Sequence, residues 1–98
     1  MKKILPIGTV VCLRGQNKVR RMLIGYFPKQ GNQIFDYLGV ACPTGLTHEK
    51  KVFLINESDI LHVEQIGYEN ELFSRMAENM TRLMTKDENI FRNIEDEG

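Results

Sequence analysis

Two cysteines and two histidines are the residues of this 98-residue chain best suited to metal or nucleophilic chemistry. Cys12 and Cys42 lie far apart in the chain, and no C-x-x-C pair occurs. A zinc site made of Cys12, Cys42 and His48 would lack the paired-ligand spacing that structural zinc sites have. We therefore expect no metal and no cofactor. In a reducing cytoplasm, both cysteines are expected to be buried small hydrophobic residues.

Carboxylates are the next candidates, since two of them held together can act as general acid and base. Asp36, Glu57, Asp59 and Glu64 occur in or beside predicted strands, but their positions along those strands bring no two of them together. The sequence also lacks G-x-S-x-G, G-x-G-x-x-G, Walker-type and H-E-x-x-H motifs. These observations predict a protein that is not an enzyme.

Basic residues gather in the first predicted hairpin, where they are expected to form a charged rim: Arg14, Lys18, Arg20 and Arg21. Residues 1–35 contain seven Lys and Arg and no acid, whereas residues 36–98 contain six Lys and Arg and thirteen acids. The whole chain has a formal net charge of zero, which argues against a dedicated nucleic-acid binder. A small β-barrel that stacks bases on Tyr26, Phe35 and Tyr37 is kept as an alternative.

The elements that must position these residues are mostly strands. Up to residue 67, glycines recur between short runs of β-branched and aromatic residues, which is typical of successive antiparallel strands and turns. The predicted strands form a five-stranded meander over residues 9–14, 19–27, 33–41, 51–55 and 61–66. Residues 56–59 are expected to form one capped helical turn. In the last strand, Leu61 and Val63 should face inward and His62 and Glu64 outward.

From Tyr68 the apolar spacing changes to a helical period, close to a heptad. The repeating positions are Phe73, Met76, Met80, Leu83, Asp87, Ile90 and Ile94, with Leu72, Met84 and Phe91 widening the stripe. The pattern predicts either one helix of about 27 residues or two segments broken near Thr85, where Thr85 and Glu88 can form a capping box.

Together these elements predict an α+β fold: a five-stranded antiparallel curled sheet or small open barrel, followed by a long C-terminal amphipathic helix. We expect an antiparallel β domain over residues 1–67 and the C-terminal helix with an acidic tail over residues 68–98, one domain overall. An unbroken helix would run about 40 Å, more than such a small sheet can cover. The alternative is that the helix folds back at Thr85 and buries its own stripe.

The apolar stripe is the expected protein-binding surface, formed by Leu72, Phe73, Met76, Met80, Leu83 and Met84. Methionines at successive i+4 positions give an adaptable surface that suits a helical partner. That partner is either another helical protein or a second copy of the chain, giving a homodimer. No apolar run is long enough to span a membrane, and no small-residue cleavage site follows the N-terminus, so we expect a cytoplasmic protein.

Short stretches across the predicted β region follow a recognisable order: LPIGTVV (5–11), MLIGY (22–26), FDYLGV (35–40), PTG (43–45), FLIN (53–56) and IGY (66–68). This series resembles a small uncharacterised family of Gram-positive bacteria whose members open with LPIGSVV-L-G. Members of that family are typically encoded beside type VII secretion genes and LXG polymorphic toxins. The resemblance implies a chaperone or adaptor for the helical N-terminal region of an LXG toxin, and it brings no catalytic or cofactor residue. An immunity-type protein that binds a toxin's C-terminal domain is the alternative.

Overall fold

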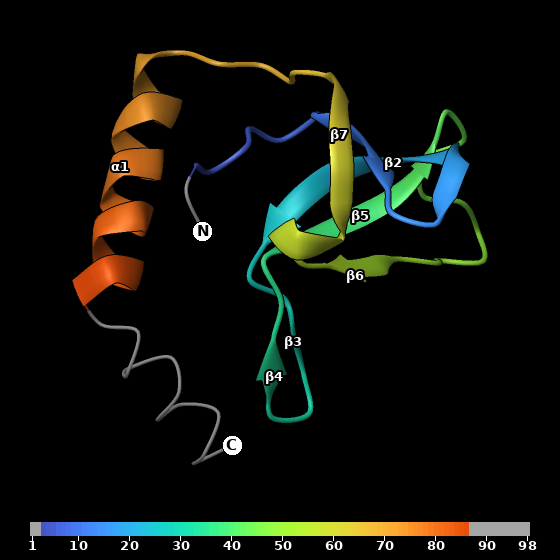
Figure 1. Cartoon of the computed structure of the whole chain (residues 1–98), viewed down its shortest axis with the longest axis horizontal. Helices are drawn as coiled ribbons and strands as arrows, with labels where there is room; N and C mark the ends of the chain where they lie inside the picture. Colours follow the sequence, from blue (N-terminus) through green and yellow to red (C-terminus); the bar gives the residue numbers. More distant parts are fainter. Residues whose placement is uncertain (1–2, 87–98) are drawn as a thin grey trace.

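The structure, a computed structural model, describes residues 3–86, apart from the side chains at positions 17, 18 and 83–86. Its regular structure consists of a five-stranded antiparallel sheet, a separate two-stranded ribbon and one C-terminal α-helix (Figure 1). The sheet is open and does not close into a barrel. The predicted α+β fold is therefore confirmed.

The main sheet contains β1 (Val10–Leu13), β2 (Gln16–Tyr26), β5 (Tyr37–Cys42), β6 (Phe53–Ile55) and β7 (Ile60–Gln65). The ribbon consists of β3 (Lys29–Gln30) and β4 (Gln33–Ile34), and it extends the connection between β2 and β5. A 3₁₀ turn, η1 (Glu57–Asp59), precedes β7, and α1 (Glu71–Lys86) ends the described chain.

The strand order β6-β5-β2-β1-β7 corrects the expected simple meander. The first four strands do follow one another, but β7 pairs with β1 instead of β6, at the opposite edge of the sheet. The capped turn predicted at residues 56–59 is present, because the Asp59 carboxylate accepts the Asn56 N–H at 2.9 Å. The Arg14 N–H then donates to the Asp59 carbonyl at 2.8 Å. This bond holds the turn against β1 and directs the chain to the far edge.

The core lies over β1, β2, β5 and β6, where Val11, Leu23, Tyr37 and Ile55 pack together. A bulge in β2 makes this core possible, since Leu23 is opposite Gly39 and Gly25 is opposite Leu38, leaving Ile24 as the extra residue. The bulge allows Leu23 and Tyr26 to contact the same core although they are three residues apart.

The last strand departs from the predicted inward and outward faces. Leu61 and Val63 are 44% and 37% exposed instead of buried. The expectation fails because β7 is an edge strand beyond β1, outside the area that the core covers.

A close approach between two backbone segments fixes the end of the sheet. The N–H of Gly67 donates to the fully buried Thr9 Oγ1 at 3.0 Å. A Cβ at Gly67 would lie 2.2 Å from the Ile7 carbonyl oxygen and 2.6 Å from the Thr9 nitrogen. Only glycine therefore fits at this position without moving the backbone.

Two tyrosines tie the N-terminal segment (residues 3–9) to the sheet. The Tyr37 hydroxyl accepts the Leu5 N–H at 3.1 Å, and the Tyr26 hydroxyl donates to the Leu5 carbonyl at 2.6 Å. Their rings pack with centroids 5.9 Å apart. Burial raises the pKa of Tyr37 to about 12, so its phenol stays protonated at physiological pH.

The helix begins three residues later than the sequence pattern indicates. Asn70 is the N-cap, since its Oδ1 accepts the Phe73 N–H at 2.8 Å, and α1 starts at Glu71. The helix then continues without a break through Thr85 to Lys86. The predicted positions from Asp87 onward, including Glu88, Ile90, Phe91, Ile94 and the acidic tail, lie outside the described residues.

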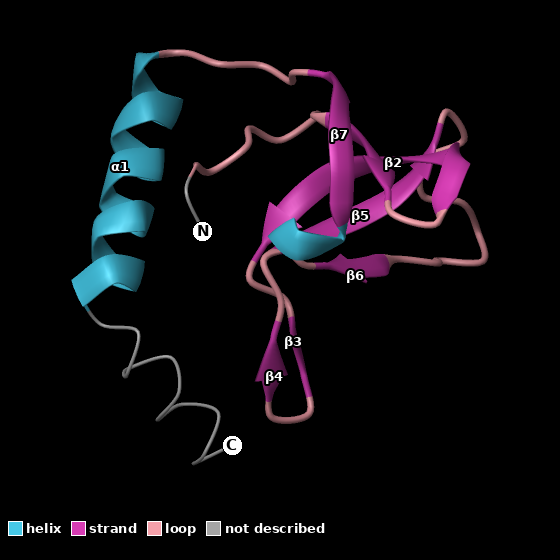
Figure 2. Ribbon diagram, viewed as in Figure 1, coloured by secondary structure: helices cyan, strands magenta, loops and turns pink. Residues whose placement is uncertain are grey.

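The α1 helix stands beside the sheet and does not lie across its face (Figure 2). The N-terminal segment runs between them (Figure 1). Within residues 3–86, neither η1 nor α1 combines the length and the hydropathy that crossing a membrane requires.

We predict that Gly67→Ala destabilises the fold by on the order of 1–3 kcal/mol, because the added methyl group must displace the Ile7–Thr9 backbone. Urea unfolding followed by circular dichroism measures the loss. Gly25→Ala is the matched control, since its Cβ would meet Leu38 at an ordinary 3.5 Å. Equal losses in both variants would contradict the role assigned to Gly67.

We also predict that Tyr37→Phe lowers the free energy of unfolding by roughly 1–3 kcal/mol, because the Leu5 N–H loses its acceptor in a part-buried position. The same unfolding assay applies. Tyr68→Phe removes a hydroxyl from a ring that is 76% exposed, and it should leave stability within about 0.5 kcal/mol of wild type. If Tyr37→Phe had the same free energy of unfolding as wild type, the Tyr37 hydroxyl would not anchor the N-terminal segment.

Candidate functional site

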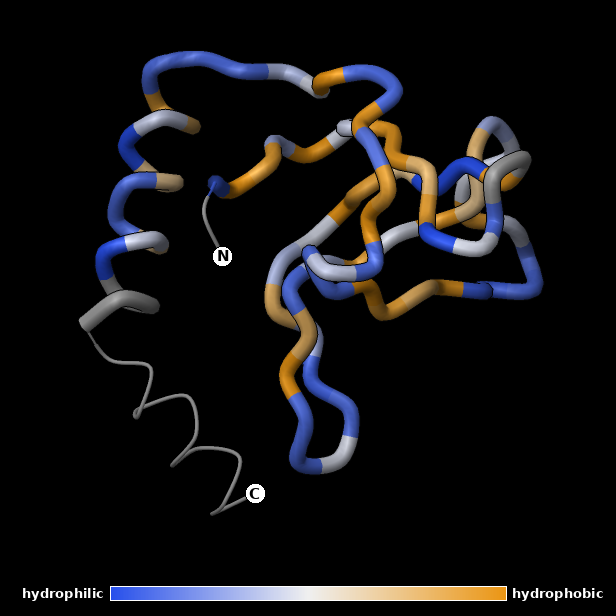
Figure 3. Tube along the Cα trace, viewed as in Figure 1, coloured by the Kyte–Doolittle hydropathy of each residue, from blue (hydrophilic) through white to orange (hydrophobic). Residues whose placement is uncertain are grey.

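One side of α1 turns toward the N-terminal segment. Phe73, Ala77 and Thr81 line a hollow of about 600 Å³ together with Lys3 and Ile4. Ile4 is only 2% exposed, and hydrophobic residues follow the N-terminal segment between α1 and the sheet (Figure 3). Phe73, one residue of the apolar stripe, thus faces the rest of the molecule.

The adjoining side of α1 stays open to solvent. Leu72 and Met76 are 72% and 37% exposed, although both belong to the predicted apolar stripe. With Ile7, Tyr68 and Phe73 they line a shallow groove of about 380 Å³, in which Asn70 is the only polar lining residue. We call these five apolar residues the α1 groove. Its exposed carbon surface is costly in water unless another apolar surface covers it.

The structure thus divides the six residues predicted to bind a partner. Leu72 and Met76 are exposed, while Phe73 and Met80 are half-buried. The side chains of Leu83 and Met84 lie outside the described part of the chain. The helix is continuous through Thr85 to Lys86, and the alternative in which the chain folds back and buries its stripe concerns residues outside the described part of the chain.

Charged residues occupy another arc of α1. Arg75 pairs with Glu71 at 2.6 Å and Arg82 with Glu78 at 3.8 Å, both one turn apart. These exposed i,i+4 pairs contribute a few tenths of a kcal/mol each to helix stability. They separate the α1 groove from the solvated side of the helix.

The described arginines of the predicted charged rim have different partners, although Arg14 and Arg21 line a common hollow. Arg14 donates from Nε to the Ser58 carbonyl at 3.0 Å, and the Arg21 guanidinium stacks over the Phe53 ring at 3.9 Å. Arg20 forms an ion pair with Glu64, and the side chain of Lys18 lies outside the described residues. The three described arginines are therefore engaged by different parts of the chain.

The burial of the predicted base-stacking residues argues against the nucleic-acid alternative. Tyr37 is fully buried and Tyr26 is half-buried, and both hydroxyls bond to Leu5. The Tyr37 ring therefore has no exposed face on which a base can stack, and Phe35, the third residue of this alternative, is half-buried.

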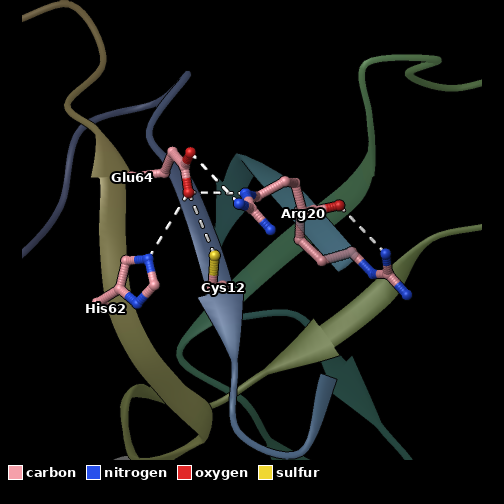
Figure 4. A network of polar contacts seen from close by, with 5 residues as sticks. Cys12, Arg20, His62 and Glu64 are labelled. Carbon is pink, nitrogen blue, oxygen red and sulfur yellow. Dashed lines mark hydrogen bonds and ion pairs between the residues drawn. The ribbon is translucent and has the colours of Figure 1, made fainter. Parts of the chain in front are cut away.

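A polar cluster crosses three strands of the sheet (Figure 4). Cys12 on β1 is opposite Arg20 on β2 and opposite His62 on β7, and Glu64 follows two residues after His62. Glu64 Oε2 lies 2.7 Å from Arg20 Nε, 3.4 Å from Cys12 Sγ and 3.6 Å from His62 Nε2. Three different side chains thus meet at one carboxylate oxygen. We call these four residues the Cys12 cluster.

The protonation states in this cluster follow from its contacts. Hydrogen bonds from Cys12 and then Arg20 lower the pKa of Glu64, against a smaller opposing effect of burial. Burial raises the pKa of the Cys12 thiol, and its hydrogen bond to Glu64 raises it further, while the positive charge of Arg20 opposes both. At neutral pH the cluster therefore contains a carboxylate, a guanidinium and a protonated thiol.

Sequence reasoning placed His62 and Glu64 on one face of the last strand but brought neither Cys12 nor Arg20 to them. The expectation that Cys12 is buried is confirmed, whereas Cys42 is half-buried, and both thiols are free. The metal-ligand group that the structure assembles is Cys12, His62 and Glu64, different from the set weighed above. The His-x-Glu pair at 62–64 was a usable signal, because alternate residues on a strand share a face. Its partner Cys12 depends on β7 crossing to β1.

The fold and its surfaces define a small α+β protein with an open antiparallel sheet and a laterally placed, partly uncovered C-terminal helix. The model of one family, described as a domain of unknown function (DUF4176), matches residues 4–76. The chain belongs to this family. No curated protein and no solved structure matches the chain.

We predict that the stabilising effect of Glu64 is lost in acid. Because the folded protein lowers the pKa of Glu64, the contribution is present above its unfolded pKa of about 4.3 and disappears as the pH falls through the native pKa. The difference in unfolding free energy between wild type and Glu64→Gln should therefore shrink between about pH 5 and pH 2. Urea unfolding across this range measures it.

Glu49→Gln is the control, since the Glu49 carboxylate forms an exposed loop ion pair with Lys51, and the Glu49 N–H bond to Thr47 is unchanged by the substitution. Such surface pairs contribute about 0–1 kcal/mol, so this variant should track wild type closely. A wild-type to Glu64→Gln difference that stays constant down to pH 2 would contradict the role assigned to the carboxylate.

Proposed function

We propose that the chain is a non-enzymatic cytoplasmic adaptor or chaperone that binds a helical region of a type VII secretion toxin or component. The binding surface is the α1 groove. The observation that supports this proposal most directly is the exposure of Leu72 and Met76 on a helix that does not lie on the sheet.

The shape of the groove favours a helical partner. Ile7, Leu72 and Met76 offer an apolar surface along the side of α1, into which a second amphipathic helix can place residues at i, i+3, i+4 and i+7. The ion pair Arg75–Glu71 lies on the same turns of α1 as Leu72 and Met76, and it offers charged groups of both signs to the partner's edge.

The resemblance to a family encoded beside LXG toxins supports the choice of partner. In this proposal the groove covers an apolar helix face in the N-terminal region of the toxin. The flexible side chain of Met76 in the groove can adapt to such a surface. Family membership over residues 4–76 includes the first part of α1 with Leu72 and Met76, so the proposed surface lies inside the matched region.

We predict that Leu72→Asp/Met76→Asp abolishes binding of the helical N-terminal region of an LXG toxin encoded beside the gene. Two carboxylates in the groove must lose their hydration when a partner helix docks, which costs several kcal/mol and weakens binding at least about 100-fold. Co-purification after co-expression and isothermal titration with the purified toxin region measure the effect.

The matched control is Gln30→Asp/Asn32→Asp, which adds the same two charges on the exposed β3–β4 ribbon, away from α1 (Figure 1). This variant should bind as wild type does. Undiminished binding by Leu72→Asp/Met76→Asp would exclude the α1 groove. Binding to the toxin's C-terminal domain with loss of toxicity would support the immunity alternative, and a concentration-dependent molar mass of the free chain would support a homodimer.

A further inference from the structure

The Cys12 cluster contains three side chains of the kinds that bind zinc. Cys12 Sγ, His62 Nε2 and a Glu64 oxygen all lie within 4.8 Å of one another. The Glu64 Oε2 atom is 3.4 Å from the sulfur and 3.6 Å from the imidazole nitrogen. In a tetrahedral zinc site with bonds of about 2.0–2.3 Å, neighbouring ligand atoms are roughly 3.3–3.6 Å apart. The observed separations therefore match two edges of such a tetrahedron.

The strand pairing explains why the three ligands converge. Cys12 and His62 are directly opposite each other on β1 and β7. Glu64 follows two residues later at a bulge of β7, because Val63 is opposite Val11 and Gln65 is opposite Val10, and its Oε2 comes within reach of both other ligands. The three ligands thus come from neighbouring strands. Cys12 is buried at the base of the cluster, whereas the His62 and Glu64 side chains are 55% and 42% exposed.

We propose that Cys12, His62 and Glu64 bind one Zn²⁺ ion on the face shared by β1 and β7, with water as the fourth ligand. A thiolate combined with an imidazole and a carboxylate suits Zn²⁺, which is borderline-soft. Mg²⁺ and Ca²⁺ prefer all-oxygen sites, so they are not expected to bind here.

Arg20 is the competing group in the cluster. Its Nε lies 2.7 Å from Glu64 Oε2, the oxygen that the zinc ion would take, while its Nη2 lies 3.4 Å from Oε1. When zinc binds, the contact between Arg20 and Glu64 Oε2 is broken and the hydrogen bond from Arg20 to Oε1 remains. Arg20 then orients the carboxylate without binding the ion. The guanidinium therefore lowers the affinity for zinc without blocking the site.

The reaction is a ligand exchange that releases a proton. A cysteine binds Zn²⁺ as its thiolate, so the Cys12 thiol must lose its proton when the ion binds. Zn²⁺ forms a bond to the sulfur, and the thiol proton leaves to the solvent, so binding strengthens as the pH rises. The ion then links β1 to β7 through its bonds to Cys12, His62 and Glu64. This link lies close to Gly67, where the chain continues toward α1.

The full-length chain, freed of metal by a chelator, is titrated first with Zn²⁺ and then with Co²⁺ as a spectroscopic substitute. We expect one ion per chain, release of a proton measured in weakly buffered solution, and thiolate-to-cobalt charge-transfer absorption. The thermal unfolding midpoint should rise with zinc concentration, since the ion binds the native state.

Three single variants test the ligands: Cys12→Ser, His62→Ala and Glu64→Gln. Loss of an outer-shell partner typically costs about 10–100-fold in metal affinity, so loss of a ligand should cost at least this much. His62 and Glu64 are exposed, and these two variants remain informative if Cys12→Ser fails to fold. Arg20→Gln should bind zinc more tightly than wild type, because it removes the competing guanidinium.

Cys42→Ser/His48→Ala is the control for zinc binding elsewhere on the chain, and it should bind like wild type. The proposal is overturned if zinc does not bind, if cobalt binds without thiolate absorption, or if His62→Ala and Glu64→Gln bind as tightly as wild type. None of these measurements involves a toxin, so failure of the zinc site and failure of the proposed adaptor function remain distinguishable.

Discussion

The arrangement of this protein depends on the close backbone contact between Gly67 and residues 7–9. At this point the chain leaving β7 passes so near the N-terminal segment that no side chain fits, and the buried Thr9 hydroxyl accepts the Gly67 N–H. The same segment is bonded to β2, because the Gly8 N–H donates to the Leu23 carbonyl and the Leu23 N–H to the Thr9 carbonyl. One contact therefore joins the beginning of the sheet to the start of the helical region.

This contact decides where α1 can lie. The chain leaves the sheet beside the N-terminal segment, and Phe73 of the helix and Ile4 of that segment line the same hollow. The segment itself is bonded through Leu5 to Tyr26 and Tyr37. A helix that turns one side toward this segment leaves its adjoining apolar side open. The exposed part of the stripe is thus a consequence of the fold's connectivity, and it provides the surface that we assign to a helical partner.

The edge position of β7 explains the second surface. Edge strands present unpaired backbone groups, and polar or charged side chains there discourage pairing with other chains. On β7 these are His62, Glu64 and Gln65. Where β7 pairs with β1, two of them meet the buried Cys12 thiol and the Arg20 guanidinium. Two residues, His62 and Glu64, therefore both protect the edge of the sheet and supply zinc-type ligands.

The sequence by itself determined the local elements. Alternating apolar residues and turn glycines predict the strands, residues 56–59 predict the capped turn, and the helical period after Gly67 predicts α1, because short-range periodicity and capping depend on neighbours in the chain. The apolar stripe of the helical region also showed that the chain has more apolar residues than a small sheet can cover.

Only the tertiary structure decided which strands became neighbours. The return of β7 to β1, the bulge at Ile24 and the contact at Gly67 all depend on segments that are distant in the chain, and no local pattern specifies them. For this reason Leu61 and Val63 proved exposed, and the Cys12 cluster went unforeseen. A strand's periodicity predicts that it has two faces, but its place in the sheet determines what each face meets.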